Sequence, residues 1–362
     1  MNKKYYSLKN ILAKNAQYNV IFGERSNGKT YAVLEYGLKR YAENGEQMAI
    51  VRRMAEDFTG KRGVVMFSNL VANGAVKRIT SGKWTDVYYY GSRWFLCKYD
   101  EKGNRYSDET PFAYGFAISG MEHDKSTSYP KITTVCFDEF ISRNIYLQDE
   151  FVLFMNVLST IIRQRSNVKI FLLGNTINKY CPYFSEMGLK HVKNQKQGTI
   201  DVYKYGDSGL TVAVEYAEGV GKKDSDIYFA FDNPKLQMIT GGETGAWEIG
   251  LYPHCPIKIK PADVIFTYYL QFNGDVLQCE IVRTNGEDFT FIHPKTTDIK
   301  EESPLIYTPD FHAEPNYVRK ITKPRNALER VIAEYYIKDK IFYSDNETGE
   351  IVRNYLIWCG RN

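Results

Sequence analysis

Eight residues near the start of the chain have the spacing of a phosphate-binding loop. Residues 23–30 read Gly-Glu-Arg-Ser-Asn-Gly-Lys-Thr and match the pattern G-x-x-x-x-G-K-[ST]. The glycines let the backbone curl so that its N–H groups face a phosphate, and a helix starting here adds its positive end. Lys29 is expected to contact the β- and γ-phosphates, and Thr30 to ligate Mg²⁺. The pattern predicts binding of a nucleoside triphosphate, ATP, and its hydrolysis.

The whole loop is expected to contact the nucleotide. Its residues are Gly23, Glu24, Arg25, Ser26, Asn27, Gly28, Lys29 and Thr30. For Arg25 a phosphate contact is favoured, because the loop backbone lies so close to the ligand; a solvated side chain is the alternative.

Two adjacent acids supply the second half of this chemistry. Asp138 and Glu139 follow the apolar run 132–137, where the Asp of a Walker B motif holds Mg²⁺ at the carboxyl edge of a sheet. Thr30 and Asp138 are therefore the expected metal ligands. Glu139 is expected to orient and polarise the attacking water, as in ATPases of the additional-strand catalytic-glutamate class. The simpler alternative is a pair of solvated acids at a strand end.

Further polar residues could complete the site. Asn175 ends the next apolar run and could sense the γ-phosphate or the water, or it could cap a turn. Arg163 and Arg165 end a predicted helix, where arginines are favourable partners of the helix dipole. An arginine finger that reaches the ATP of a neighbouring subunit would sit on such an element too. The pattern alone does not separate these two interpretations.

These residues need elements to position them. Short apolar runs predict buried strands at residues 18–22, 48–51, 132–137 and 169–173. Apolar residues at helical spacing predict helices at 30–42, 64–72 and 151–162. Strands alternating with helices indicate a parallel α/β sheet. The expected fold is therefore an α/β P-loop NTPase of the additional-strand catalytic-glutamate type.

The pattern changes after about residue 200. Glycine, lysine and aspartate dominate residues 206–226, so residues 201–256 are expected to form a linker or a small lid. Strands are expected again at 264–272, 276–284 and 289–292, followed by a final helix at 326–338. The predicted domains are thus an ATPase domain (1–200), the linker (201–256) and a second α/β domain (257–362).

Charge and hydropathy limit the classes of partner. The 362 residues carry a net charge of only +4, so contact with nucleic acid would need local charge or several subunits acting together. Candidate contacts to DNA phosphates are Lys61, Arg62, Lys77, Arg78 and Lys83; for each one a solvated surface charge is the simpler interpretation. The sequence has neither an apolar leader nor a run of about 20 apolar residues. A cytoplasmic location without a membrane partner is expected.

The motifs together resemble the DNA-packaging ATPases of small tailed phages of the phi29 type. The resemblance covers roughly residues 15–185. It includes the G-x-R-x-x-G-K-[ST] loop with its preceding strand and following Tyr31, and the Arg52-Arg53 pair after the second strand. It also includes a Lys-Ser…Tyr-Pro…FDEF stretch (125–140), an R-x-R motif (163–165), and Gly-Asn with the loop after it (174–184).

The resemblance implies a specific function. Such proteins form a homomeric ring, expected to be a pentamer, at the portal vertex of a preformed capsid in the host cytoplasm. They use ATP to move double-stranded DNA into the capsid; whether a packaging RNA takes part here stays open. In the family, the arginine matching Arg163 and the lysine matching Lys125 act on the ATP of the neighbouring subunit. The implied catalytic residues are Lys29, Lys125, Glu139, Arg163 and Asn175.

The resemblance also implies a C-terminal domain like that of RNase H-like nucleases that have lost their metal site. Asp275 and Glu280 lie on the expected strands, but no clear trio of acids is present, and a two-metal nuclease needs several converging carboxylates. No nuclease activity is expected.

Three alternatives to a packaging motor remain. One is a helicase-like or kinase-like P-loop ATPase unconnected with packaging, and another is a nucleotide-dependent scaffold. The third is a GTPase, which would need the motif N-K-x-D to recognise guanine. Residues 178–181 begin this way but lack the Asp, so guanine specificity is not expected.

Overall fold

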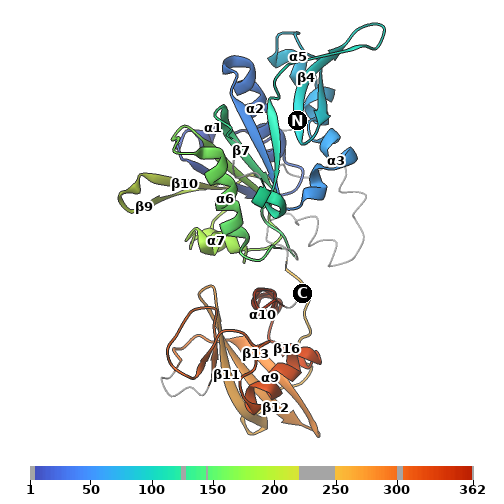
Figure 1. Cartoon of the computed structure of the whole chain (residues 1–362). Coiled ribbons are helices and arrows are strands. Elements are labelled where there is room, and N and C mark those ends of the chain that lie inside the picture. The colour runs from blue at the N-terminus through green and yellow to red at the C-terminus, as the bar shows by residue number, and fades with distance from the viewer. Residues whose placement is uncertain (1–4, 124–127, 144–145, 220–248, 300–304, 361–362) are drawn as a thin grey trace. The chain divides into compact units, whose positions relative to one another are not determined.

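The chain forms two compact units in the computed structural model (Figure 1). The structure describes residues 5–123, 128–143, 146–219, 249–299 and 305–360. The first unit takes the described residues up to 219 and the second takes those from 249. None of the described helices is both long and apolar enough to cross a bilayer.

The first unit is built on a ten-stranded sheet whose middle is parallel. In spatial order, the parallel strands are β6 (Ala113–Ala117), β2 (Gln47–Arg52), β7 (Ile132–Asp138), β8 (Lys169–Asn175), β1 (Tyr18–Gly23) and β10 (Leu210–Tyr216). Most are continuous apolar runs, as burial on both faces requires. Because β8 lies between β1 and β7, the chain after β1 and the acids that end β7 share one edge of the sheet, a strand apart.

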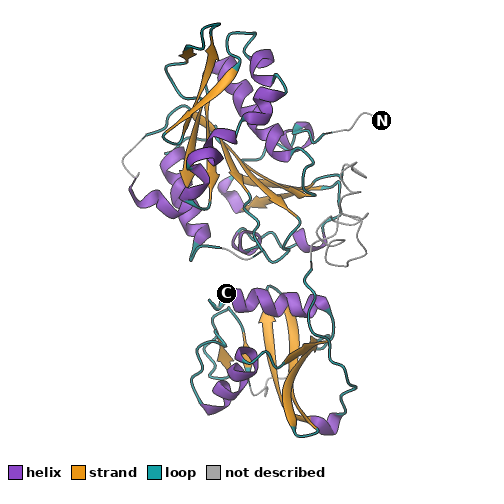
Figure 2. Cartoon of the chain, turned by 90° about the vertical axis from the view of Figure 1, so that its right-hand side faces the viewer, coloured by secondary structure: helices purple, strands orange, loops and turns teal. Residues whose placement is uncertain are grey.

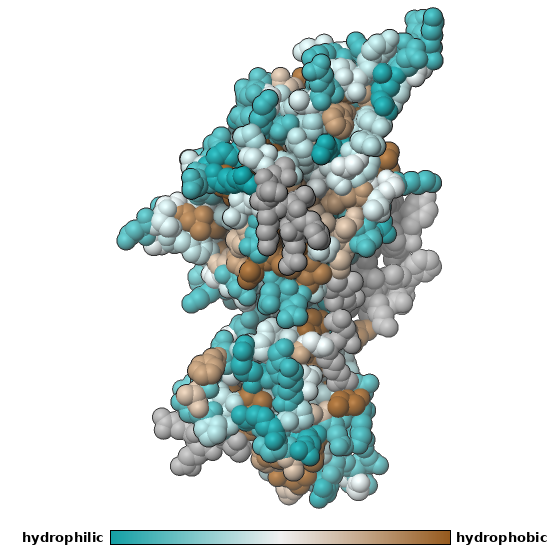
Figure 3. Space-filling model, viewed as in Figure 1, coloured by the Kyte–Doolittle hydropathy of each residue, from teal (hydrophilic) through white to brown (hydrophobic). Residues whose placement is uncertain are grey.

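Antiparallel strands flank this parallel core. At one side β4 (Arg93–Tyr99) pairs with β6, and β3 (Asp86–Tyr90) and β5 (Arg105–Ser107) pair with β4. The tip of the β4–β5 hairpin projects from the unit, and Figure 3 shows hydrophilic residues covering it. At the other side β9 (Ile200–Tyr205) pairs with β10.

Helices cover both faces of the large sheet (Figure 2). One face packs against α6 (Glu150–Ile162) and α7 (Pro182–Glu186); the other packs against α1 (Lys9–Leu12), α2 (Lys29–Asn44), α4 (Ser68–Ala72) and α5 (Ala75–Ile79). The strands alternate accordingly, with Val20 and Phe22 on the α6 side and Ile21 on the α2 side. The helix expected at 64–72 is divided into α3 (Gly60–Val65) and α4. Short 3₁₀ turns occupy Ala55–Phe58, Ile118–His123, Val192–Asn194, Gly206–Ser208 and Pro261–Asp263.

The expected linker needs correction in its first part. Residues 200–216 form the β9–β10 hairpin, and β10 completes the parallel core next to β1. Val212 and Val214 are buried on one face and Ala213 on the other, so this segment is central to the sheet and not a loose connection. Residues 220–248 lie outside the described part of the chain, and residues from 249 pack in the second unit.

The second unit contains a six-stranded sheet in the order β15-β14-β11-β12-β13-β16. Its strands are β11 (Val264–Phe272), β12 (Asp275–Thr284), β13 (Glu287–Pro294), β14 (Ile306–Tyr307), β15 (Tyr317–Val318) and β16 (Ile341–Tyr343). The first three form an antiparallel meander. Three short strands extend the meander, and all of them pair in parallel. β14 pairs with β11, β15 pairs with β14, and β16 pairs with β13.

Two helices pack on one face of this second sheet. The hydroxyl of Tyr336 in α9 (Ala327–Ile337) lies 2.9 Å from that of Tyr268, and the ring of Tyr355 in α10 (Asn346–Trp358) lies against Phe272. The expected helix at 326–338 corresponds to α9, but it is not the final one. Asp345 caps α10 by accepting the Thr348 N–H at 2.8 Å, and the sequence analysis missed this helix.

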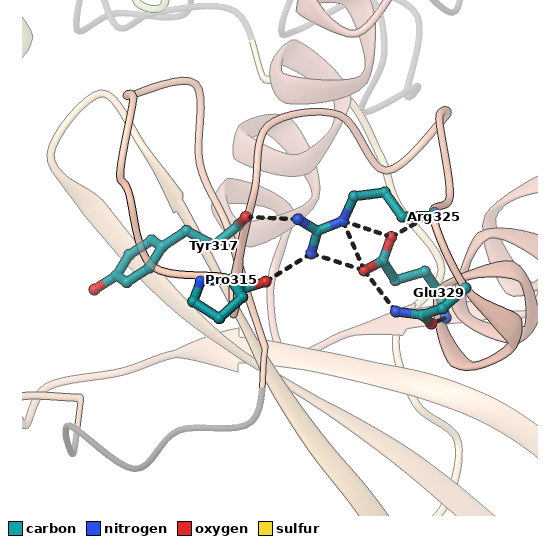
Figure 4. A network of polar contacts seen from close by, with 5 residues as sticks. Pro315, Tyr317, Arg325 and Glu329 are labelled. Atoms are coloured by element: carbon teal, nitrogen blue, oxygen red, sulfur yellow. Dashed lines mark hydrogen bonds and ion pairs between the residues drawn. The ribbon is translucent and has the colours of Figure 1, made fainter.

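A buried carboxylate fixes the start of α9 (Figure 4). Glu329 accepts from the guanidinium of Arg325, which also donates to the carbonyls of Pro315 and Tyr317. Asn326 caps the helix by accepting the Glu329 N–H at 2.9 Å. This network ties the helix to the chain that leads into β15.

Candidate nucleotide-binding site

The chain between β1 and α2 turns through left-handed backbone conformations. Ser26 has a φ of 61° and Gly28 a φ of 94°, a conformation that favours glycine. Gly28 directly precedes the first residue of α2. The predicted phosphate loop therefore lies in its required context, between a buried strand and a helix N-terminus.

Lys29 points back into this loop. Its side-chain ammonium lies 2.7 Å from the carbonyl of Glu24 and 3.1 Å from Oδ1 of Asn27, and 3.4 Å from Oδ1 of Asn175 on β8. Only 5% of the lysine is exposed. These three oxygens are neutral, and the charged oxygens of a phosphate could replace them with a stronger charge-assisted bond.

Thr30 and Asp138 meet across the carboxyl edge of the sheet. The Thr30 hydroxyl donates to Asp138 Oδ1 at 3.1 Å, and the guanidinium of Arg52 lies 2.8 Å from Asp138 Oδ2. Burial raises the pKa of Asp138, and the Arg52 cation opposes this shift. Mg²⁺ takes hard oxygen ligands at about 2.0–2.1 Å. The two oxygens are of the right type and close enough to bind one such ion together.

Glu139 has an unusual backbone and a charged partner. Its φ is 63°, which is uncommon for a residue other than glycine. Its side chain is 68% exposed and lies 2.8 Å from Nη1 of Arg52. Arg52 therefore contacts both acids of the predicted Walker B pair.

Arg53 holds the backbone beside these acids. It donates to the carbonyl oxygens of Glu139 at 3.3 Å and Phe140 at 3.0 Å. It also forms a two-pronged ion pair with the buried carboxylate of Glu150, at 2.7 and 2.9 Å. Glu150 accepts a further hydrogen bond from the hydroxyl of Tyr183 at 2.9 Å. The N-terminus of α6 is thereby fixed to the loop that follows β7.

A cavity of about 1090 Å³ joins these residues. Asp138, Glu139 and Asn175 are among its lining residues. Tyr5, Tyr6, Arg78 and Glu35 of α2 line it too. The loop residues Arg25, Ser26, Asn27, Gly28, Lys29 and Thr30 line it as well. Glu24 does not; its carboxylate accepts from Gln197 at 3.2 Å.

The two arginines after α6 differ in their surroundings. Arg165 donates to five backbone carbonyls, namely those of Tyr129, Pro130, Ile132, Ile161 and Ile162, and so joins the end of α6 to the start of β7. Arg163 is exposed, with a left-handed backbone (φ 40°) at the C-cap. The contacts of Arg165 thus give it a structural role within its own chain, whereas Arg163 lies on the surface.

Several predicted residues lie elsewhere. Lys125 is outside the described residues. The five candidate DNA contacts are exposed, but Arg62 pairs with Asp57 at 3.5 Å, and Arg78 pairs with Glu35 at 2.8 Å in the cavity lining. Sequence reasoning assigned no role in the site to Arg52 or Arg53. The available signal was a pair of arginines directly after an apolar strand.

The fold and the site together define an α/β domain with a predicted phosphate-binding loop at the carboxyl edge of a parallel sheet. Residues 1–204 match the family described as podovirus DNA encapsidation protein (Gp16). This match covers more than half of the chain, and the chain belongs to that family.

Named relatives agree with this membership. The DNA packaging protein of Bacillus phage B103 is 26% identical over 175 residues, 47% of this chain and 48% of the relative. That of Bacillus phage phi29 is 25% identical over 200 residues, 54% of each chain. The chain thus aligns with about half the length of these relatives.

Solved structures extend the likeness of fold to the whole chain. A chain of the Phi-28 gp11 DNA packaging motor has a TM-score of 0.53 at 17% identity, covering 99% of this chain and 98% of that one. A chain of the bacteriophage Phi-29 genome packaging motor assembly has a TM-score of 0.55 at 18% identity, covering 98% of each. At these identities the likeness concerns the fold alone.

Proposed function

We propose that this chain is the ATPase subunit of a homomeric ring that drives double-stranded viral DNA into a preformed capsid. The observation that carries the proposal is the contact of Thr30 with Asp138 at 3.1 Å across β8, with Glu139 next in the chain. The intervening strand supports a P-loop NTPase of the additional-strand catalytic-glutamate class. Family membership supports packaging as the work done.

The loop residues that line the cavity bind and orient ATP. The loop N–H groups and Lys29 hold the phosphates, and Thr30 and Asp138 are the residues that would hold Mg²⁺. The ion, when bound, neutralises charge on the β- and γ-phosphates. Asn175, already within 3.4 Å of the Lys29 ammonium, is placed to contact the γ-phosphate end.

Glu139 is the residue that orients and polarises the attacking water. A carboxylate in an ion pair with Arg52 at 2.8 Å is a weaker hydrogen-bond acceptor for water. Hydrolysis therefore requires Glu139 to leave Arg52, and Arg52 can keep its second partner, Asp138, while this happens.

Arg163 completes the site from the neighbouring subunit, and Lys125 is proposed to act in the same way. Mixing Lys29→Ala with Arg163→Ala subunits tests this arrangement. Each variant alone should be inactive, and mixed rings should regain turnover at interfaces that pair one intact loop with one intact finger. Absence of any recovery at high protein concentration would count against a shared site.

The second unit is proposed to be an RNase H-like domain without nuclease activity. Its strand order β13-β12-β11-β14-β15, with β12 antiparallel to its neighbours, supports the RNase H-like assignment. Glu280 is engaged by Gln278 at 2.7 Å and lies near His293. Incubating the protein and plasmid DNA with Mg²⁺ or Mn²⁺ should leave the DNA intact.

Packaging itself can be measured directly. Purified protein, empty capsids carrying the portal, duplex DNA and ATP should give nuclease-protected DNA, and DNA with capsids should stimulate ATP hydrolysis. The proposed partners are this DNA and the portal, in the host cytoplasm. An ATPase rate that ignores both DNA and capsids would contradict the proposal and favour an ATPase unconnected with packaging.

A further inference from the structure

The chain before α1 crosses the phosphate loop. We call residues 5–8 the N-terminal strap. The Tyr6 N–H donates to the carbonyl of Asn27 in the loop at 3.0 Å, and the Tyr6 hydroxyl donates to Glu215 of β10 at 2.6 Å. Leu8 is buried in the core between α2 and the sheet. The strap is therefore anchored to the loop, to the sheet and to the core.

This anchoring presents Tyr5 to the cavity. The Tyr5 side chain contacts Gly28, where its Cδ1 lies 3.5 Å from the position of an added Cβ. Tyr5 lines the cavity, yet 68% of the residue is exposed. An aromatic ring held beside a phosphate loop with most of its surface open can accept a planar group by stacking.

The roles proposed for the lining residues set the direction of a bound nucleotide. In the proposed ATP site the γ-phosphate faces Asp138, Glu139 and Asn175, and the β-phosphate lies over the loop with Lys29. The strap and the Glu35–Arg78 ion pair line the same cavity and have no role toward the phosphates in that site. These residues, with Tyr5 in contact with Gly28, are therefore left for the nucleoside.

We propose that Tyr5 forms the base subsite of this chain, with the aromatic face of Tyr5 stacked on the base of the bound nucleotide. This inference rests on the proposed ATP site and specifies how the nucleoside is recognised. The Glu35–Arg78 pair bounds the subsite. Stacking on an aromatic ring is tolerant of base identity and contributes on the order of tenfold in affinity.

Binding to the purified full chain tests the proposal with two probes, Mg-ATP and inorganic tripolyphosphate, measured by titration calorimetry. Tyr5→Ala should weaken ATP binding on the order of tenfold and leave tripolyphosphate binding unchanged, because only ATP carries a base. Tyr5→Phe keeps the ring and should bind both as the unmodified chain does. Tyr90→Ala, which removes an equally exposed tyrosine from β3, is the matched control and should change neither.

Two other results of these binding measurements would contradict the proposal. Equal loss of both probes in Tyr5→Ala would show that the strap only supports the loop, and unchanged ATP binding would place the base elsewhere; either result overturns the proposal. Failure of the proposed function looks different. In that case the unmodified chain would bind neither probe, or Lys29→Ala would bind both normally.

Discussion

At the scale of single residues, the backbone of Glu139 shows how the site is held. A left-handed conformation costs a residue other than glycine roughly 1–2 kcal/mol. Arg53 donates to the carbonyls of Glu139 and Phe140, and these bonds offset the cost. The Glu139 side chain is exposed, lies beside Arg52 and lines the cavity.

Replacing Glu139 by Gln tests its role in hydrolysis. The amide keeps the size of the side chain but cannot accept the proton of the attacking water. We expect turnover to fall on the order of 10²–10⁴-fold, the usual contribution of such a group, with ATP affinity retained. Steady-state hydrolysis and equilibrium binding measure the two effects. Lys29→Ala, which should lose binding itself, is the comparison; normal turnover in Glu139→Gln would refute the assignment.

Sequence alone located the loop and the acidic pair, but it did not show the partners of the two acids. The phosphate loop and the Asp-Glu pair are local patterns, each next to an apolar strand. The partners of Asp138 and Glu139 are Arg52 and Arg53; Arg52 is 86 positions from Asp138, and Arg53 is 86 positions from Glu139. Only the order of strands in the sheet reveals such pairs.

At the scale of elements, α6 is tied to the sheet at both ends. Glu150 in its first turn binds Arg53, and Arg165 beyond its last turn donates to carbonyls at the start of β7. Its buried face packs on Phe137 through Phe154. The helix that precedes the proposed finger is thus attached to the sheet beside the loop that carries Glu139.

Removing the Glu150 carboxylate should destabilise the first unit. The Glu150 side chain is 3% exposed and the Arg53 side chain 11%, so Glu150→Ala leaves a buried cation without its partner. We expect a loss of about 3–5 kcal/mol in the free energy of unfolding, measured by urea denaturation. Glu43→Ala, at a solvated ion pair of α2, should cost less than about 1 kcal/mol. Equal effects would mean that the buried pair contributes little.

In the second unit, β12 and β13 present a pH-dependent pair. His293 Nε2 lies 3.6 Å from Glu280 Oε1. The interaction with Glu280 raises the pKa of His293, and the same interaction lowers the pKa of Glu280. The contribution of His293 to stability is fully present at pH values below the usual histidine pKa of about 6.5, and it is lost as the pH rises through the raised pKa. The contribution of Glu280 to stability is fully present at pH values above the usual glutamate pKa of about 4.3, and it is lost as the pH falls through the lowered pKa.

The midpoint of the His293 titration, followed by NMR of its ring protons, should therefore fall in Glu280→Gln. The physical reason is that the neutral amide no longer favours the charged imidazolium. Asp288→Asn on the same strand, where the acid pairs with Arg283, is the control and should leave the midpoint in place. An unchanged midpoint in Glu280→Gln would show that the pair does not form in solution.

At the scale of the whole molecule, apolar runs predicted the parallel core, but they misplaced the boundary after it. The polar turn at Gly206–Ser208 obscured the β9–β10 hairpin, although Val212 and Val214 alternate with Ala213 as a strand buried on both faces would. The start of the second unit was also misplaced, since residues 249–256 carry no periodic pattern. Their place comes from contacts with α10, which the sequence analysis missed.

The segment before residue 257 contributes to the stability of the second unit. Gly250 N–H and the Tyr252 hydroxyl both donate to Glu350, which is 1% exposed, and the Tyr252 ring occupies the space beside Gly349. A fragment of residues 249–362 should therefore be more stable than one of residues 257–362, by about 2–4 kcal/mol for one lost aromatic and two hydrogen bonds. Thermal and urea unfolding of both fragments would decide it; identical midpoints would contradict the expectation.

The chain leaves the large sheet directly beside the phosphate loop. Ala217, just after β10, donates its N–H to Phe22 at 2.8 Å and packs against Gly23, and Gly219 lies against the Glu24 carboxylate. The chain that leads toward the second unit thus begins in contact with Gly23 and Glu24, the first two residues of the predicted phosphate loop. If the chain acts as the proposed motor, a change in the shape of this loop would act directly on the segment after β10. A bulky residue at position 219 should therefore weaken the coupling between hydrolysis and DNA movement more than hydrolysis itself, which the ratio of ATP consumed to DNA packaged would measure.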